Sequence, residues 1–201
     1  MTKITELSQL DMNGTYSYAD YLTWRLEESV ELIKGKIMAM SPAPNRQHQS
    51  ISGNLFLSLG THFKRKPCRV YVAPFDVKLY DRHKSKLSNQ DTFSVVQPDL
   101  CVVCDKDKLT DLGCDGAPDW IIEVLSPGNS KKELRLKYDL YQENGVTEYW
   151  TVHPVEQAVY QFVLAQDSEK YQLFAVHPGN EIATPYLFPD LQIDLNDIFA
   201  E

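Results

Sequence analysis

The pattern of apolar and polar positions predicts two long amphipathic helices in the middle of the chain. Apolar residues recur at every fourth position from residue 45 to about 66, which is typical of a helix with one buried face. A second helix is expected over residues 131–144. Asn129 or Ser130 can cap its first turn, and Gly145 can end it. The segment between these helices carries the apolar runs of a sheet.

Strands are expected between and after the two helices. Apolar stretches indicate them over residues 69–80, 95–104, 118–127 and 146–152, with Pro74 and Pro98 inside the first two. The order helix, three strands, helix, strand predicts an α/β fold with a mixed central sheet covered by helices on both sides. Shorter elements flank this core: a helix over 18–28 capped by Ser17, a strand over 30–40 with a turn or bulge at Lys34-Gly35, a hairpin of 158–164 and 171–176, and a last helix capped by Asp194.

Composition places the chain among ordinary globular proteins, with 43% hydrophobic and 24% charged residues. We expect a single domain over residues 1–201, in which residues 1–14 are flexible. No apolar run approaches the roughly 18 residues that a membrane span requires, and the N-terminus lacks a signal-peptide pattern. The four cysteines are unevenly spread, so no disulfide framework is expected, and we interpret the protein as cytoplasmic.

Charge is distributed unevenly along the chain. The net charge is −8, but residues 46–86 hold nine basic and two acidic residues, a local charge of +7 against −15 for the rest. Such asymmetry suits a protein that offers one basic face to a phosphate backbone. A solvated helix end followed by an exposed loop would give the same pattern, so charge alone leaves both interpretations open.

One carboxylate, Glu123, lies inside the apolar run of residues 118–127. Burying an ionised carboxylate costs several kcal/mol unless a cation or hydrogen-bond donors compensate. Asp99 stands in the preceding predicted strand, so the two acids can point to one place if these strands pair. Two close carboxylates favour Mg²⁺ or Mn²⁺, and Lys137 on the following helix could stabilise developing negative charge beside such an ion.

The order of these residues resembles the PD-(D/E)XK nuclease superfamily. More closely, it is similar to the Uma family of restriction endonuclease-like proteins, and the resemblance extends over residues 17–199. The motifs that carry it are Glu31-Leu32-Ile33-Lys34-Gly35, Met40-Ser41-Pro42, His48, Gln97-Pro98-Asp99-Leu100, Ala117-Pro118-Asp119, Glu123-Val124-Leu125-Ser126-Pro127, Lys137 and Gly145-Val146-Thr147-Glu148-Tyr149-Trp150.

This resemblance implies a restriction-endonuclease-like fold and a Mg²⁺-dependent (or Mn²⁺-dependent) endonuclease that hydrolyses DNA phosphodiesters. Asp99 and Glu123 would then be metal ligands, with the Val124 carbonyl as a third. Leu125 stands where the superfamily has its lysine, and Lys137 would replace that lysine. A homodimer is also implied, because cutting both strands takes two sites.

Further site residues are expected around this centre. The superfamily's acid on the first helix is missing, and Glu31 or His48 could serve instead. The candidates for contacts with DNA phosphates are Arg46, Lys64, Arg65 and Lys66.

Each assignment has a structural alternative. Asp99 could cap a strand end, and Glu123 could form a buried ion pair with Lys137 or Arg135. Lys137 could instead pair with Glu133 four residues before it. For the whole chain, the alternative is a catalytically silent nucleic-acid-binding or interaction protein that retains the nuclease fold; hydrolysis of a smaller phosphodiester is a third possibility. A zinc site at Cys101-x-x-Cys104 is not expected, because residues three apart in a strand point to opposite faces.

Overall fold

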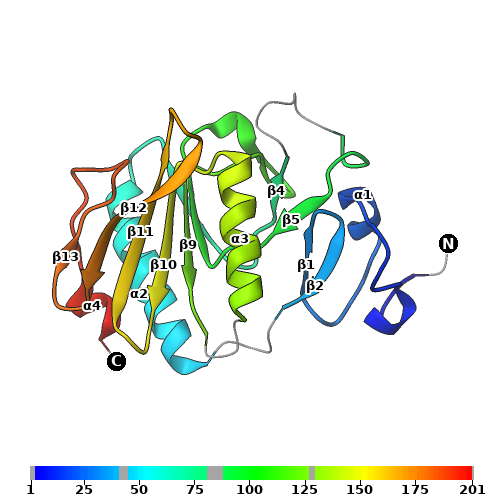
Figure 1. Ribbon diagram of the computed structural model, residues 1–201, viewed down its shortest axis with the longest axis horizontal. Coiled ribbons are helices and arrows are strands. Elements are labelled where there is room, and N and C mark those ends of the chain that lie inside the picture. Colours follow the sequence, from blue (N-terminus) through cyan, green and yellow to red (C-terminus); the bar gives the residue numbers. More distant parts are fainter. Residues whose placement is uncertain (1–2, 41–44, 81–87, 127–129, 201) are drawn as a thin grey trace.

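The strands form two mixed sheets that meet near the middle of the molecule (Figure 1). The computed structural model describes residues 3–40, 45–80, 88–126 and 130–200. Ser41 and Pro42 of the motifs above and three of the basic residues counted there, Arg82, Lys84 and Lys86, lie outside these ranges. The expected mixed α/β architecture is confirmed.

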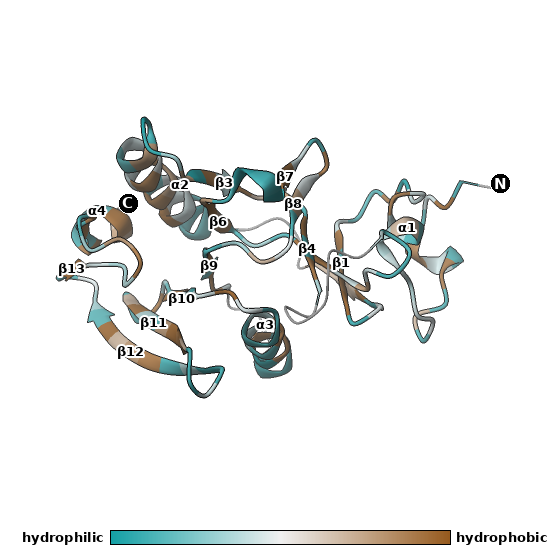
Figure 2. Ribbon diagram, turned by 90° about the horizontal axis from the view of Figure 1, so that it is seen from above, coloured by the Kyte–Doolittle hydropathy of each residue, from teal (hydrophilic) through white to brown (hydrophobic). Residues whose placement is uncertain are grey.

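The first sheet contains the strand that carries Glu123. Its order, from edge to edge, is β12 (Lys170–Pro178), β11 (Ala158–Ala165), β10 (Glu148–His153), β9 (Trp120–Val124), β6 (Leu100–Val103) and β3 (Arg69–Val72). The parallel pair β9 and β10 is joined through helix α3 (Lys131–Asn144), as a crossover connection requires. Helix α2 (Arg46–Phe63) lies on the other side of this sheet from α3 (Figure 2).

Both faces of this sheet are therefore buried. On one face, the residues of α2 that recur every fourth position pack with α4 (Leu195–Phe199) and with Trp120 and Trp150 of the sheet. On the other face, Leu140 and Tyr141 of α3 pack with Tyr149. This double cover explains why β9 reads as an almost continuous apolar run.

The second sheet carries Glu31 and lies toward the N-terminal end of the molecule. Its order is β2 (Lys36–Ala39), β1 (Val30–Ile33), β5 (Ser94–Val96), β4 (Val77–Leu79), β8 (Gly113–Asp115) and β7 (Leu109–Thr110). The smaller elements are the 3-10 helices η1 (Leu7–Gln9) and η2 (Lys106–Lys108), helix α1 (Tyr18–Tyr21), and the strand pair β13 (Ile182–Ala183) and β14 (Ile193–Asp194).

Two expected strands are each divided at a proline, and this division creates the second sheet. The strand expected over 69–80 becomes β3 and β4, separated at Pro74, and the strand expected over 95–104 becomes β5 and β6, separated at Pro98. Proline has no N–H for a ladder, so a strand tends to end there. The two breaks are joined by the Ala73 N–H, which donates to the Asp99 carbonyl at 3.1 Å. Asp99 therefore lies where the chain passes from one sheet to the other.

The ends of the elements show how local chemistry sets them. Helix α3 has the predicted bounds, with Ser130 as its N-cap and Gly145 in the left-handed region at φ 81°. The strand expected over 30–40 is a hairpin, because Lys34 and Gly35 both take positive φ values and form its turn.

The first helix is shorter than expected. Ser17 and Asp20 form the expected capping box, but α1 ends at Tyr21. The Arg25 guanidinium donates to the carbonyls of Leu22 and Trp24, and this satisfies acceptors that a longer helix would have used. Upstream, in the segment expected to be flexible, η1 forms and Leu10 is buried.

One expectation about the cysteines is wrong. Cys68 and Cys104 form a disulfide. They lie just outside the paired strands β3 and β6, where the register Arg69↔Val103 brings them opposite each other. Because Cys104 is bonded to Cys68, it cannot serve with Cys101 as a zinc ligand. No helix within the described ranges combines the length and apolar character needed to cross a membrane, and the cytoplasmic location stays a prediction.

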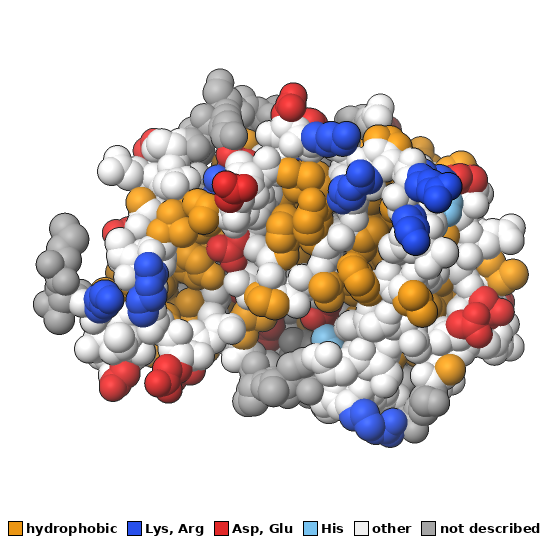
Figure 3. Space-filling view, turned by 180° about the vertical axis from the view of Figure 1, so that it is seen from behind, with side chains coloured by type: hydrophobic (Ala, Val, Ile, Leu, Met, Phe, Trp, Pro, Cys, Tyr) orange, Lys and Arg blue, Asp and Glu red, His pale blue; other side chains and the backbone are white. Residues whose placement is uncertain are grey.

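The basic residues expected to contact phosphates lie at opposite ends of α2. Arg46 begins this helix, and Lys64, Arg65 and Lys66 follow its last residue. With 18 residues and a rise of about 1.5 Å per residue, the two ends are about 27 Å apart. Basic side chains gather at the upper right of the face in Figure 3, beyond this C-terminal end. Lys64 and Arg65 are exposed, whereas Lys66 is paired with Asp190 at 2.6 Å.

Candidate active site

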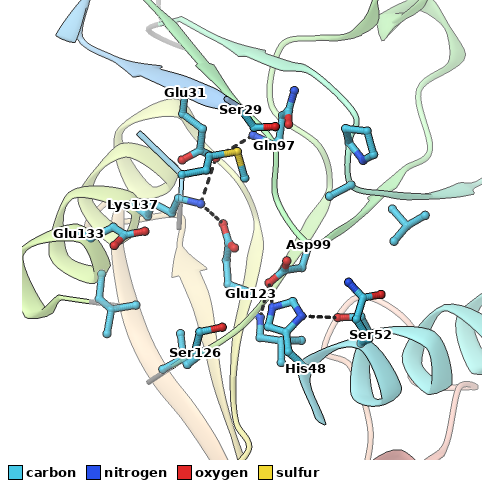
Figure 4. A pocket seen from close by; sticks show the side chains of 18 of the residues that line it. Ser29, Glu31, His48, Ser52, Gln97, Asp99, Glu123, Ser126, Glu133 and Lys137 are labelled. Atoms are coloured by element: carbon cyan, nitrogen blue, oxygen red, sulfur yellow. Dashed lines mark hydrogen bonds and ion pairs between the residues drawn. The ribbon is translucent and has the colours of Figure 1, made fainter. Parts of the chain in front are cut away.

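A pocket of about 370 Å³ lies at the junction of the two sheets (Figure 4). Five expected site residues line it, each from a different part of the fold: Glu31 from β1, His48 from α2, Asp99 from the connection before β6, Glu123 from β9 and Lys137 from α3. The structure therefore brings together residues that are up to about a hundred positions apart in the sequence. Val124 and Leu125 also line the pocket.

Lys137 links the two sheets by pairing with two carboxylates. Its Nζ lies 3.0 Å from Glu123 Oε1 and 3.1 Å from Glu31 Oε1. The backbone N–H of Gln97 donates to the same Glu31 oxygen at 2.8 Å. The alternative pairing of Glu123 with Lys137 is thus present in the structure, whereas Arg135 pairs with Asp139 on the surface. Sequence reasoning left the role of Glu31 open, and its contact with Lys137 gives it a definite place.

Tyr141 is a site residue that sequence reasoning missed. Its hydroxyl donates to Glu123 Oε1 at 2.6 Å, and the ring is fully buried. Lys137 and Tyr141 are four residues apart, so they lie on the same face of α3 and reach the same carboxylate oxygen. In the sequence alone, this tyrosine reads as part of the core face of the helix. The i, i+4 spacing from Lys137 was the signal that could have identified it.

Asp99 is held by two donors on a single oxygen. The Val124 N–H donates to Asp99 Oδ2 at 2.7 Å, and His48 Nε2 lies 3.2 Å from the same oxygen. The other ring nitrogen of His48 lies 3.4 Å from Ser52 Oγ, one helical turn further along α2. His48 is positioned by Asn45, which caps α2 by accepting the His48 N–H. The imidazole therefore orients Asp99 from the helix side of the pocket.

Burial and neighbouring charges determine the protonation of the pocket. Burial raises the pKa of Glu123 to about 7, and the Lys137 ammonium opposes that shift. Burial alone would lower the pKa of Lys137, but Glu123 and Glu31 raise it above its ordinary value. For His48, burial likewise lowers the pKa, yet the Asp99 carboxylate and the Val124 carbonyl raise it overall. The two carboxylates therefore favour the charged form of Lys137, and burial makes Glu123 easier to protonate than an exposed glutamate.

In three of the pocket carboxylates, one oxygen accepts hydrogen bonds and the other has no partner among the described residues. All the hydrogen bonds and ion pairs of Glu31, Asp99 and Glu123 with described residues go to one oxygen of each carboxylate. Oxygen donors of this kind are the ligands that Mg²⁺ and Mn²⁺ prefer, so the donor set fits the expected ions. Within the described ranges, no three His, Cys, Asp or Glu side chains are grouped closely enough to hold an ion by themselves. An ion here would need Val124 or the substrate to complete its coordination.

The two sheets, the covering helices and this pocket define a restriction-endonuclease-like α/β protein. The family model described as "Putative restriction endonuclease" (Uma2) matches residues 18–196, and the chain belongs to this family. A solved structure, titled as a putative nuclease belonging to DUF820 from Anabaena variabilis ATCC 29413, is similar to it. The TM-score is 0.68 and the identity 21%, over 92% of this chain and 98% of that one. No curated protein matches the sequence.

Proposed function

We propose that this protein is a Mg²⁺-dependent endonuclease that hydrolyses DNA phosphodiesters in the pocket between the two sheets. The observation that supports this most directly is the one-sided hydrogen bonding of Asp99 and Glu123. Two recessed carboxylates that each keep one oxygen without a partner among the described residues would be stabilised by a shared cation, and this supports the proposal. Mn²⁺ could replace Mg²⁺ at such a site.

The pocket also needs a cation before a phosphate can enter it. Its lining includes four carboxylates, Glu31, Asp99, Glu123 and Glu133, and one lysine, whose ammonium already pairs with two of them. A phosphodiester would meet net negative charge there. A divalent ion held by Asp99, Glu123 and the Val124 carbonyl would offset most of this charge, polarise the phosphate and lower the pKa of bound water.

The residues of the chain then have distinct tasks. Lys137 places a fixed positive charge beside Glu123, where it can stabilise charge that develops on the phosphate. Glu31 and Tyr141 hold Lys137 and Glu123 in position, and His48 orients Asp99. Water attacks phosphorus, one P–O bond breaks, and the products are a phosphate monoester end and a hydroxyl end.

We also propose which basic residues contact DNA and that two copies of the chain form a homodimer. Arg46 is exposed at the start of α2, one turn before the lining residue Gln49, and in this proposal it contacts phosphates beside the cut. Lys64 and Arg65 would meet DNA only about 27 Å away along α2. A homodimer would place two such sites on one duplex.

The first experiment measures cleavage of DNA with Mg²⁺ and with Mn²⁺ by the wild type, Asp99→Asn and Glu123→Gln. We expect each variant to lose at least about a hundredfold in rate, since the metal supplies several kcal/mol of transition-state stabilisation. Glu27→Gln changes an exposed carboxylate and is the matched control. Absence of cleavage of every DNA form with both ions would refute the proposal.

Leu125 favours a second candidate, a nucleic-acid-binding protein of nuclease fold that does not cut. It lines the pocket at the position where the superfamily has its lysine. Calorimetry with Mn²⁺ separates the two functions without relying on activity. An enzyme of the proposed kind shows Mn²⁺ binding that Asp99→Asn weakens, whereas a silent binder shows DNA binding with a steep salt dependence and no response to the ion.

A further inference from the structure

The depth of the catalytic residues limits the form of DNA that can reach them. The side chains of Glu123 and Lys137 are each 9% exposed, that of Glu31 is 4% exposed, and Asp99 reaches 21%. A divalent ion held by Asp99 and Glu123 would act on the phosphate only at short range, so the scissile phosphate would have to come close to these groups. The phosphate therefore has to enter the pocket instead of passing over its mouth.

The size of the pocket is that of a small-molecule site. Its volume of about 370 Å³ lies at the lower end of the range for pockets that enclose one ligand. A base-paired and stacked duplex cannot enter such a space. Enzymes that act on a base inside a duplex admit one nucleotide, either from a single strand or after it leaves the stack, and a phosphate this deep in the pocket would bring its own nucleotide with it.

The lining of the pocket suits a nucleotide base or sugar more than a row of phosphates. The lining includes six apolar residues, Met40, Val72, Ala73, Pro74, Leu125 and Leu134. Lys137 is the only Lys or Arg among the described residues that line the pocket. Backbone contacts to a duplex are made mainly by such basic side chains, and the exposed ones in the first turns of α2 and α3, Arg46, Lys131 and Lys132, do not line the pocket.

From this geometry we infer that the pocket takes an unpaired nucleotide, and that the preferred substrate is DNA that is single-stranded at the cut. This inference rests on the proposed nuclease function and adds the class of substrate. An intact duplex must first release a nucleotide from its stack, and that cost lowers the rate of cutting. One unpaired strand needs one site, so the preference holds for a monomer and for a dimer.

The test presents one labelled oligonucleotide in three forms to the full chain with Mg²⁺ or Mn²⁺: as a single strand, as a complete duplex, and as a duplex with an unpaired central bubble. We expect the single strand and the bubble to be cut at least about tenfold faster than the duplex, with the cuts inside the bubble. Equal or faster cutting of the complete duplex would overturn the inference and leave the nuclease function standing. Absence of cutting in all three forms would overturn the nuclease function itself.

A pair of variants tests the pocket directly. Val72 lines it and is 41% exposed, so Val72→Trp should fold and should fill part of the cavity. Leu57→Trp introduces the same side chain at a 69% exposed position of α2 that does not line the pocket. We expect Val72→Trp to slow single-strand cleavage and weaken binding of an oligothymidine by about tenfold each, while Leu57→Trp changes neither. Equal behaviour of the two variants would contradict a nucleotide in this pocket.

Discussion

Two buried glutamates on neighbouring parallel strands, Glu123 on β9 and Glu148 on β10, are held in different ways. Glu148 accepts on both oxygens. Trp150 Nε1 at 2.7 Å, Gln161 Nε2 at 2.8 Å and the Tyr186 N–H at 3.0 Å donate to Oε1, and the Leu187 N–H donates to Oε2 at 2.9 Å. Glu123 accepts on Oε1 alone, from Tyr141 and from the charged Lys137.

The difference separates a structural carboxylate from one that can work on a ligand. Burial raises the pKa of both groups, but neutral N–H donors oppose the shift at Glu148, whereas the Lys137 ammonium opposes it at Glu123. The donors of Glu148 fasten residues 186–187 to the sheet and leave its oxygens fully used. Glu123 keeps one oxygen without a partner among the described residues and depends on the Lys137 ammonium for its charge balance.

The largest expected effect on stability comes from removing that cation. Lys137→Met leaves Glu31 and Glu123 buried without their common partner, and we expect the free energy of unfolding to fall by about 3–5 kcal/mol in denaturant titrations without metal. Added Mn²⁺ should recover part of this loss, because an ion between the carboxylates binds only the folded state.

Lys34→Met is the control for this prediction. Lys34 also forms an ion pair, with Glu143 at 2.7 Å, but both side chains are about half exposed or more, and such pairs contribute at most about 1 kcal/mol. If Lys137→Met costs no more than Lys34→Met, then Lys137 does not balance the buried carboxylates.

The next effect compares the two glutamates directly. Glu148→Gln places an amide NH₂ against at least one of four N–H donors, and we expect a loss of about 2 kcal/mol in unfolding free energy with cleavage unchanged. Glu123→Gln retains an acceptor for Tyr141 and should cost less than about 1 kcal/mol while cleavage is lost. Thermal unfolding and cleavage rates of both variants check this prediction. If Glu148→Gln lost cleavage and Glu123→Gln lost mainly stability, Glu148 would be the active-site residue and Glu123 the structural one.

The buried environment of Glu123 could be predicted from the sequence, whereas that of Glu148 could not. Glu123 stood out because a single acid interrupted an apolar run, so a need for a compensating cation followed from burial alone. Glu148 gave no such signal, because its donors come from residues 150, 161, 186 and 187, and only the completed fold brings them together. A feature that depends on neighbouring residues can be read from the sequence, whereas one that depends on distant residues requires the fold.

The same contrast holds for the elements. Ser130 and Gly145 set the bounds of α3 by contacts within a few residues, and the sequence predicted that helix fully. The division of the two strands at Pro74 and Pro98 produces a second sheet, and its consequence depends on which strands pair across the break. In the second sheet β1 pairs with β5, and its Glu31 meets Lys137, a contact that no spacing along the chain indicated.

The smallest expected effect tests whether Tyr141 belongs to the site or to the core. Tyr141→Phe keeps the packing of the ring and removes one donor to Glu123, so we expect a loss of about 1 kcal/mol in unfolding free energy. A group that orients a metal ligand also affects the ion, and we expect Mn²⁺ affinity to fall by about tenfold in calorimetry. Tyr138→Phe, on the same helix, removes a hydroxyl that donates to the Tyr171 carbonyl and should leave Mn²⁺ binding unchanged. If both variants bind Mn²⁺ as the wild type does, the hydroxyl of Tyr141 serves only the core, and Lys137 alone determines how Glu123 is held.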